Sequence, residues 1–260
     1  MHKNRIKEKW NHDKMAVGTY VNLADPAVVE IIGLAGFDAA FIDMEHTAFN
    51  FETVQQMLRA CDLVGISSLV RVPDNNTKTI LRVLDMGAQG VQIPHIGGKE
   101  DATNMVKAVR YAPLGERGMG GPTRAARYGA LPSAEHLDTS NSEILLSVMI
   151  EDKTAIDELE EMASIEGVDL VTVGPTDLAQ ALGIPENEYP HLMETIEHIS
   201  KTLKRVGKAK LALPLNLPAF PLTIFQLKTL GVAYANCGPA DVGRLMDSYK
   251  NQIDEIKSYL

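Results

Sequence analysis

The chain has 260 residues, of which 45% are hydrophobic and 23% are charged, an ordinary composition for a globular protein with a large core. Its net charge of −9 argues against a polyanionic partner such as DNA or RNA. No apolar run is long enough to span a bilayer, and no apolar segment follows the basic N-terminus, so neither a membrane span nor a secretory signal is expected.

The chain contains two cysteines, Cys61 and Cys237, which are too few for a disulfide framework. This low number predicts a reducing, cytoplasmic location. Cys61 lies within a helical pattern, so we expect it to pack in the core rather than act as a nucleophile.

Eight short apolar runs alternate with segments of helical periodicity. The runs cover residues 15–23, 38–44, 67–72, 88–94, 144–150, 169–174, 209–215 and 232–237. Several intervening segments open with Asn or Asp and end on Gly, the residues that cap helices. Eight buried strands alternating with helices predict an α/β fold, a (β/α)8 TIM barrel. A doubly wound open sheet is the competing fold.

No linker or low-complexity segment divides the chain, so residues 1–260 are expected to form one domain, with residues 1–14 as an N-terminal extension. Residues 112–143 form a long insertion after the fourth strand–helix unit. Because loops of that length are usually functional, we expect a mobile loop near the substrate. Its arginines, Arg117, Arg124 or Arg127, would meet the distal end of an anionic substrate.

Polar residues gather where the predicted strands end, which is where barrel enzymes carry their active groups. They are Asp43, Glu45 and His46 after the second strand, Arg71 in the third, Glu151 after the fifth and Asp177 after the sixth. Each alone could be a solvated charge at a strand end. Four strands with the same pattern predict an active site.

The residue types indicate a chemistry. The carboxylates of Glu151 and Asp177 suit a divalent cation such as Mg²⁺, Mn²⁺ or Co²⁺. Arg71 could stabilise an oxyanion, and His46 is the candidate base because its ordinary pKa lies near neutrality. The backbone N–H groups of "GPTD" could hold an anionic carboxylate. Asp85 is predicted to lie away from the strand ends. It would reach His46 only through folding that the sequence pattern does not predict or through a subunit contact.

The motifs resemble the HpcH/HpaI aldolase family. They are "GFDAAFIDMEH", "VRVP", "LDMGAQGVQIP", "VRYAPLGERGMG", "MIE" and "GVDLVTVGPTDLA", in the family's order and spacing. The resemblance implies a barrel of the phosphoenolpyruvate/pyruvate superfamily. It also implies a class II, metal-dependent aldolase that cleaves a 4-hydroxy-2-oxo acid into pyruvate and an aldehyde through a metal-bound pyruvate enolate. Family substrates include 4-hydroxy-2-oxoheptanedioate and 2-dehydro-3-deoxy sugar acids.

The resemblance also implies roles for individual residues. Glu151 and Asp177 would bind the metal. His46 would accept a proton, with Asp85 raising its basicity, and Arg71 would stabilise the transition state. No organic cofactor is implied, and the partners are a small 2-oxo acid and an aldehyde.

Further implications concern the substrate and the assembly. Backbone groups of Thr176 and Asp177 would bind the pyruvate carboxylate. We expect Asp43 to orient neighbouring groups, whereas Glu45 could equally be a solvated rim residue. The family exchanges its last helix between subunits, here residues 238–260, and usually forms homohexamers.

One position departs from the family pattern. Many members carry Gln two residues before the metal-binding Glu, where this chain has Met149, which cannot donate a hydrogen bond to substrate. His95 could compensate, although a lone His there is more often structural.

Rival interpretations are a related pyruvate-enolate lyase or oxaloacetate decarboxylase, and a non-catalytic metal-binding barrel, which only Met149 supports. A class I aldolase would need a Schiff-base lysine, but Lys208 and Lys210 lie at the N-terminal end of the seventh strand. A dinucleotide site at "RGMGGP" lacks the required strand–turn–helix context.

Overall fold

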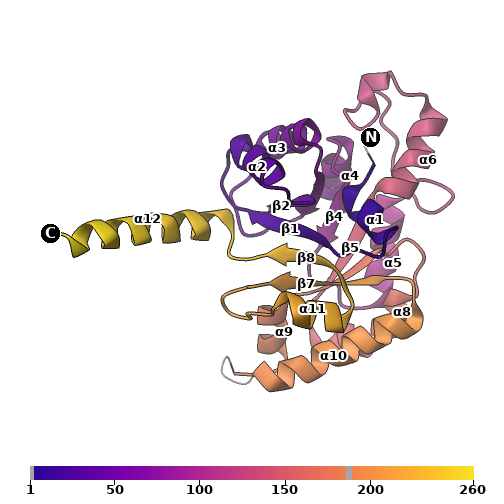
Figure 1. The fold of residues 1–260 in the computed structure, drawn as a ribbon. Helices are drawn as coiled ribbons and strands as arrows, with labels where there is room; N and C mark the ends of the chain where they lie inside the picture. The colour runs from indigo at the N-terminus through magenta and orange to yellow at the C-terminus, as the bar shows by residue number, and fades with distance from the viewer. Residues whose placement is uncertain (1–2, 186–188) are drawn as a thin grey trace.

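The computed structural model, which describes residues 3–185 and 189–260, contains a closed barrel of eight parallel strands in chain order (Figure 1). The strands are β1 (Ala16–Val21), β2 (Ala39–Asp43), β3 (Ser67–Arg71), β4 (Gly90–Ile93), β5 (Leu145–Ile150), β6 (Leu170–Val173), β7 (Lys210–Leu215) and β8 (Val232–Cys237). Every strand falls within one of the eight predicted runs, and β8 pairs with β1. The (β/α)8 prediction is confirmed, and the open-sheet alternative is wrong.

Helices connect the strands and surround the barrel. They are α1 (Arg5–Trp10), α2 (Pro26–Leu34), α3 (Phe51–Val64), α4 (Thr77–Asp85), α5 (Lys99–Val109), α6 (Ser133–Glu143), α7 (Lys153–Asp157), α8 (Leu159–Ala163), α9 (Pro175–Ala181), α10 (Tyr189–Val206), α11 (Ile224–Leu230) and α12 (Asp241–Ser258), with a short 3-10 turn η1 (Arg127–Gly129). Capping follows the sequence signals. In α3 the Asn50 side chain accepts the N–H of Thr53, and Gly65 ends the helix in the left-handed conformation with φ 72°.

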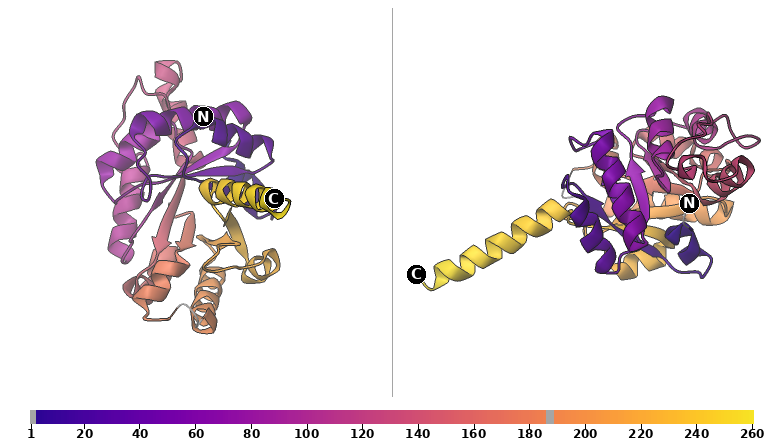
Figure 2. Two further views of the ribbon diagram at one scale, coloured as in Figure 1. Left: turned by 90° about the vertical axis from the view of Figure 1, so that its left-hand side faces the viewer. Right: turned by 90° about the horizontal axis from the view of Figure 1, so that it is seen from above.

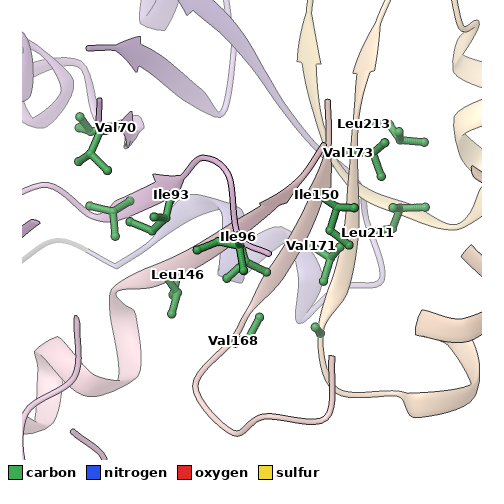
Figure 3. Close-up of a cluster of buried hydrophobic side chains, with 14 of the residues drawn as sticks. Val70, Ile93, Ile96, Leu146, Ile150, Val168, Val171, Val173, Leu211 and Leu213 are labelled. Carbon is green, nitrogen blue, oxygen red and sulfur yellow. The ribbon is translucent and has the colours of Figure 1, made fainter. Parts of the chain in front are cut away.

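Successive strand residues point to opposite faces of the sheet, and both faces are buried. The outward side chains pack beneath the surrounding helices, as Figure 3 shows for Val70, Ile93 and Leu146. The inward side chains, such as Phe41 and Leu69, form a second cluster that fills the barrel. Positions two residues apart on a strand therefore share an environment, and this alternation places the site.

The N-terminal helix α1 closes the barrel at the end where the strands begin. Ile6 is 1% exposed and belongs to the cluster that fills the barrel interior. The Asn4 side-chain amide donates hydrogen bonds to the carbonyl oxygens of Gln89 and Glu143, both at 3.0 Å. Ile6 thus contributes to the barrel core, and Asn4 connects α1 to the segments before β4 and β5.

The insertion of residues 112–143 connects α5 to β5, so it lies at the N-terminal ends of the strands and not at the predicted place near the substrate. In Figure 1 its helix α6 lies on the side opposite α12. Arg117 pairs with Asp85 at 2.8 Å, and Arg124 pairs with Asp62. Within one chain the predicted substrate contact is wrong, because a segment that leads from a helix into the next strand returns to the N-terminal end.

The last helix, α12, projects away from the barrel (Figures 1 and 2). None of its residues is buried. Its exposed large apolar side chains are Val242, Leu245, Met246, Tyr249, Ile253 and Ile256. Across the described residues, no helix is both long and apolar enough to cross a membrane.

Candidate active site

A cavity of about 350 Å³ opens at the C-terminal end of the barrel. Its lining includes Tyr20, His46, Arg71, Gln92, Met149, Thr172, Thr176, Asp177, Pro214, Tyr234 and Asn236. Several of these side chains point into the barrel near the ends of their strands. Arg71 and Thr172, for example, each lie two residues after an apolar residue of the barrel interior, Leu69 and Leu170. The barrel interior is therefore apolar near α1 and polar at the opposite end, where a site can form.

Arg71 is held by two carboxylates. Its Nε and Nη2 atoms donate to Asp43 at 2.9 and 2.6 Å, and its Nη1 lies 3.0 Å from Glu45 Oε2. Burial works to lower the pKa of Arg71, but the hydrogen bonds and charge of Asp43 outweigh it, so the pKa is raised. The Glu45 side chain is 12% exposed, so it is not a solvated rim residue. The cation is fixed in place with its charge retained.

Glu151 follows β5 and is 3% exposed. Its Oε1 accepts the backbone N–H of His95 at 2.6 Å and lies 3.2 Å from His95 Nδ1. Burial raises the pKa of Glu151, and the negative charges of Glu45 and Asp177 add to this effect while His95 opposes it. The carboxylate is therefore held where negative charge is disfavoured.

Gly174 leaves room for this carboxylate. A Cβ atom on Gly174 would lie 2.6 Å from Met149 Cε and 3.1 Å from Glu151 Oε2. The glycine of "GPTD" is therefore needed for the close approach between the end of β6 and the end of β5. The sequence pattern predicts only a role for the backbone N–H groups of this motif.

Replacement of Glu151 by Gln is expected to raise the melting temperature of the metal-free protein at neutral pH. A carboxyl group with a raised folded-state pKa stabilises the fold below its unfolded-state value near 4.3, and that contribution is lost as pH rises through the folded-state pKa. The gain should shrink below about pH 4 and should disappear when the wild type is saturated with divalent metal. Thermal melts at several pH values, with and without Mg²⁺, measure this. A variant that melts lower than wild type at pH 7 without metal would contradict it.

The charges in the site fit a bound divalent cation. Asp43, Glu45, Glu151 and Asp177 supply four carboxylates against the single guanidinium of Arg71. Within the described ranges, no group of three or more His, Cys, Asp or Glu side chains is arranged to hold a metal. Glu151 and Asp177 could supply two oxygen donors, and Mg²⁺ commonly takes one or two carboxylates together with water and substrate oxygens.

His46 lies at the mouth of the cavity. Its side chain is 65% exposed, and its Nε2 lies 3.7 Å from Glu45 Oε2. Asp85 does not approach it within the chain, because Asp85 ends α4 at the opposite end of the barrel and pairs with Arg117. The structure therefore brings together every predicted site residue except Asp85.

Several lining residues were missed by sequence reasoning. Gln92 places its Nε2 3.3 Å from Met149 Sδ, so an amide does stand beside the position that departs from the family pattern. Tyr234 donates to Asn236 at 2.5 Å, and burial raises the pKa of Tyr20 to about 12. The sequence signal that could have identified Gln92 is one polar residue within an otherwise apolar strand, as in "GVQI" of β4.

A closed (β/α)8 barrel whose polar pocket lies at the C-terminal strand ends defines a TIM-barrel enzyme. The family model for HpcH/HpaI aldolase/citrate lyase matches residues 16–213. The chain belongs to the HpcH/HpaI aldolase/citrate lyase family and is an enzyme of the lyase class.

Named relatives and solved structures agree with this membership. The chain is 36% identical to a pyruvate aldolase of Rhizobium etli over 206 residues, 79% of this chain and 80% of that protein. It is equally identical to a 5-keto-4-deoxy-D-glucarate aldolase of Salmonella paratyphi C over 207 residues, with the same coverage. The structure of an HpcH/HpaI aldolase from Desulfitobacterium hafniense superposes with a TM-score of 0.88 at 28% identity, covering 98% of this chain and 97% of that one.

Proposed function

We propose that the enzyme is a metal-dependent pyruvate aldolase that reversibly cleaves a 4-hydroxy-2-oxo acid into pyruvate and an aldehyde. The observation that carries this proposal is the fixed guanidinium of Arg71, which lines one cavity together with Asp177. The buried carboxylate of Glu151 lies close enough to Glu45 and Asp177 for their charges to raise its pKa. The names of the relatives, a pyruvate aldolase and a 5-keto-4-deoxy-D-glucarate aldolase, support the same reaction class.

Glu151 and Asp177 are proposed to hold a divalent cation, Mg²⁺, Mn²⁺ or Co²⁺, with no organic cofactor. When bound, the cation would supply Lewis-acid stabilisation of the 2-oxo acid. Thr176 and Asp177, which both line the pocket, are proposed to orient the pyruvate carboxylate through their backbone groups.

The proposed proton transfer rests on His46. Its imidazole would take the proton from the 4-hydroxyl, which allows the C3–C4 bond to break and the aldehyde to leave. The electron pair of that bond stays on the pyruvate fragment as an enolate, whose negative charge Arg71 would stabilise. Asp43 would keep Arg71 in position through its paired hydrogen bonds.

Removal of both proposed metal ligands tests the function. The Glu151→Ala, Asp177→Ala variant should lose bound metal and aldol cleavage together, because no carboxylate ligand of the proposed pair would remain. Metal content is measured by atomic absorption, and pyruvate release by a lactate dehydrogenase coupled assay. Asp152→Ala is the matched control, since Asp152 is adjacent to Glu151 in sequence but its side chain is 48% exposed, whereas Glu151 is buried. Wild-type metal stoichiometry in the double variant would contradict the assignment.

We also propose that α12 packs on another copy of the chain, in a homo-oligomer that is a hexamer by family resemblance. In a (β/α)8 barrel the helix after β8 belongs between α11 and α2, a place that α12 does not occupy. Large exposed apolar side chains lie on those two helices, including Ile31, Leu34 and Phe225. Such an assembly would also offer Asp85 of one subunit a route to His46 of another.

Charge placed on the apolar side of α12 should dissociate the oligomer. In Leu245→Asp, Ile253→Asp, two carboxylates would have to be buried at the proposed interface, which is strongly unfavourable. Light scattering after size-exclusion chromatography should give a smaller particle, and Asn251→Asp, elsewhere on the helix, should leave the mass unchanged. If the double variant keeps the wild-type mass, α12 does not make the contact.

The proposed compartment is the cytoplasm. Both cysteines are free in the structure, and burial raises the pKa of the Cys61 thiol, as expected for a reduced core residue.

A further inference from the structure

A second large cavity, of about 620 Å³, lies at the end of the barrel opposite the active site. It is bounded by the end of α1, the first residues of β7 and β8, and the end of α11. Its charged lining consists of Lys9, Lys14, Lys210, Lys228 and one carboxylate, Asp13. None of the proposed catalytic residues lines it, so the proposed aldolase reaction does not account for it.

The positive charge in this cavity is largely uncompensated. Lys9 pairs with Asp38 at 3.2 Å. Among the described residues, no carboxylate forms an ion pair with Lys14, Lys210 or Lys228. On a chain with a net charge of −9, three unpaired ammonium groups around one cavity form a local field of the opposite sign.

A smaller adjoining cavity of about 180 Å³ extends the same field. It shares Lys210 and adds Lys204 and Lys208. Lys204 Nζ donates to the carbonyl oxygen of Thr229 at 3.1 Å, and Lys208 Nζ donates to that of Ser164 at 2.9 Å. Carbonyl oxygens position an ammonium group but do not neutralise its charge, so both lysines add to the positive potential.

The wall between these lysines is aromatic and rigid. Trp10 lines the larger cavity, and its Nε1 donates to the carbonyl oxygen of Ala233 at 2.8 Å, which fixes the indole ring. Lys210 Nζ lies 5.6 Å from the ring centroid. The cavity thus combines a fixed flat surface with exposed cationic groups, and its volume is within the range of small-molecule sites.

We propose that this cavity, named here the lysine pocket and defined by Trp10, Lys14, Lys210 and Lys228, binds a small molecule that carries two or more phosphate groups. Ammonium groups on flexible stems bind phosphate as point charges, and several of them can surround a polyphosphate chain. A ligand with one carboxylate would carry too little negative charge to match the three unpaired lysines. The two sources of this chemistry are a free polyphosphate and a nucleotide whose base contacts Trp10.

Titration with tripolyphosphate and with ATP tests the proposal. Trp10 is the one tryptophan in the sequence, so its fluorescence reports on the pocket itself, and calorimetry gives the affinity independently. The test variant is Lys14→Gln, Lys228→Gln, whose exposed side chains take part in no hydrogen bond or ion pair within the described structure. The control is Lys107→Gln, Lys201→Gln, which removes the same charge from surface ion pairs elsewhere.

Saturable binding to wild type and control, weakened at least about tenfold in the test variant and weakened by added salt, supports the lysine pocket. Tighter binding of ATP than of tripolyphosphate would assign the ligand to nucleotides, and equal or weaker binding of ATP would assign it to free polyphosphates. Binding that is the same in both variants, or that never saturates, overturns the proposal. All titrations use one buffer, so chelation of active-site metal contributes equally to every protein.

Discussion

Arg71→Ala is expected to lower kcat by about 10²-fold or more, the scale for loss of one preorganised donor at a developing oxyanion. The guanidinium is already fixed by Asp43 and Glu45, so it needs no reorganisation when the enolate forms. Steady-state kinetics with a 4-hydroxy-2-oxo acid separate kcat from KM. If KM rises and kcat stays constant, Arg71 binds substrate and transition state equally, and the stabilising role is wrong.

The same change carries a structural cost. Asp43 is 2% exposed, and removing its partner leaves a buried carboxylate without a counter-charge, a loss of about 3–5 kcal/mol in such pairs. Asp43→Asn, Arg71→Ala should recover part of that stability without recovering kcat, because the amide is neutral. Comparing the two variants by denaturant unfolding separates instability from catalysis.

His46→Ala is expected to reduce aldol cleavage by about 10²- to 10⁴-fold, the usual range for loss of a general base. Its melting temperature and bound metal should be those of the wild type, because the side chain is 65% exposed and its ion-pair contact with Glu45 is long, at 3.7 Å. His12→Ala, at an exposed position near the other end of the barrel, is the matched control. Wild-type cleavage by a folded, metal-loaded His46→Ala protein would rule the assignment out.

Exchange of the pyruvate C3 protons with solvent gives a second measurement on the His46 variant. This exchange requires formation of the enolate but not cleavage of the C3–C4 bond. Selective loss of cleavage would place His46 at the 4-hydroxyl. Loss of both reactions would indicate a wider role in proton transfer.

The alternation of strand residues explains why much of the site could be predicted from sequence. Asp43, Arg71 and Glu151 each continue the inward row of an apolar strand, so a barrel must bring them to one end. Glu45 lies past the end of β2, where this alternation no longer applies, and its pairing with Arg71 depends on how the loop turns. Gln92 was overlooked because one polar residue in an apolar strand has many structural explanations.

The positions of residues 112–143 and of α12 depend on the three-dimensional arrangement of the chain, which a local sequence pattern does not encode. The composition of residues 112–143 suggested a substrate loop, but the side of the barrel on which it lies follows from chain direction. The terminal helix α12 was expected over residues 238–260, and it forms over Asp241–Ser258. Its direction away from the barrel is not encoded in local periodicity.

The pairing of β1 with β8 has a consequence for biosynthesis. Residue Gly18 is in register with Asn236, and Trp10 donates its hydrogen bond to Ala233, so both ends of the barrel sequence must be present before the ring can close. During translation, before β8 is available, the outer edge of β1 would leave its backbone N–H and C=O groups unpaired. Such an edge is prone to pair with other chains. Ring closure would therefore follow release of all eight strands, and the long sequence separation between β1 and β8 predicts slow folding.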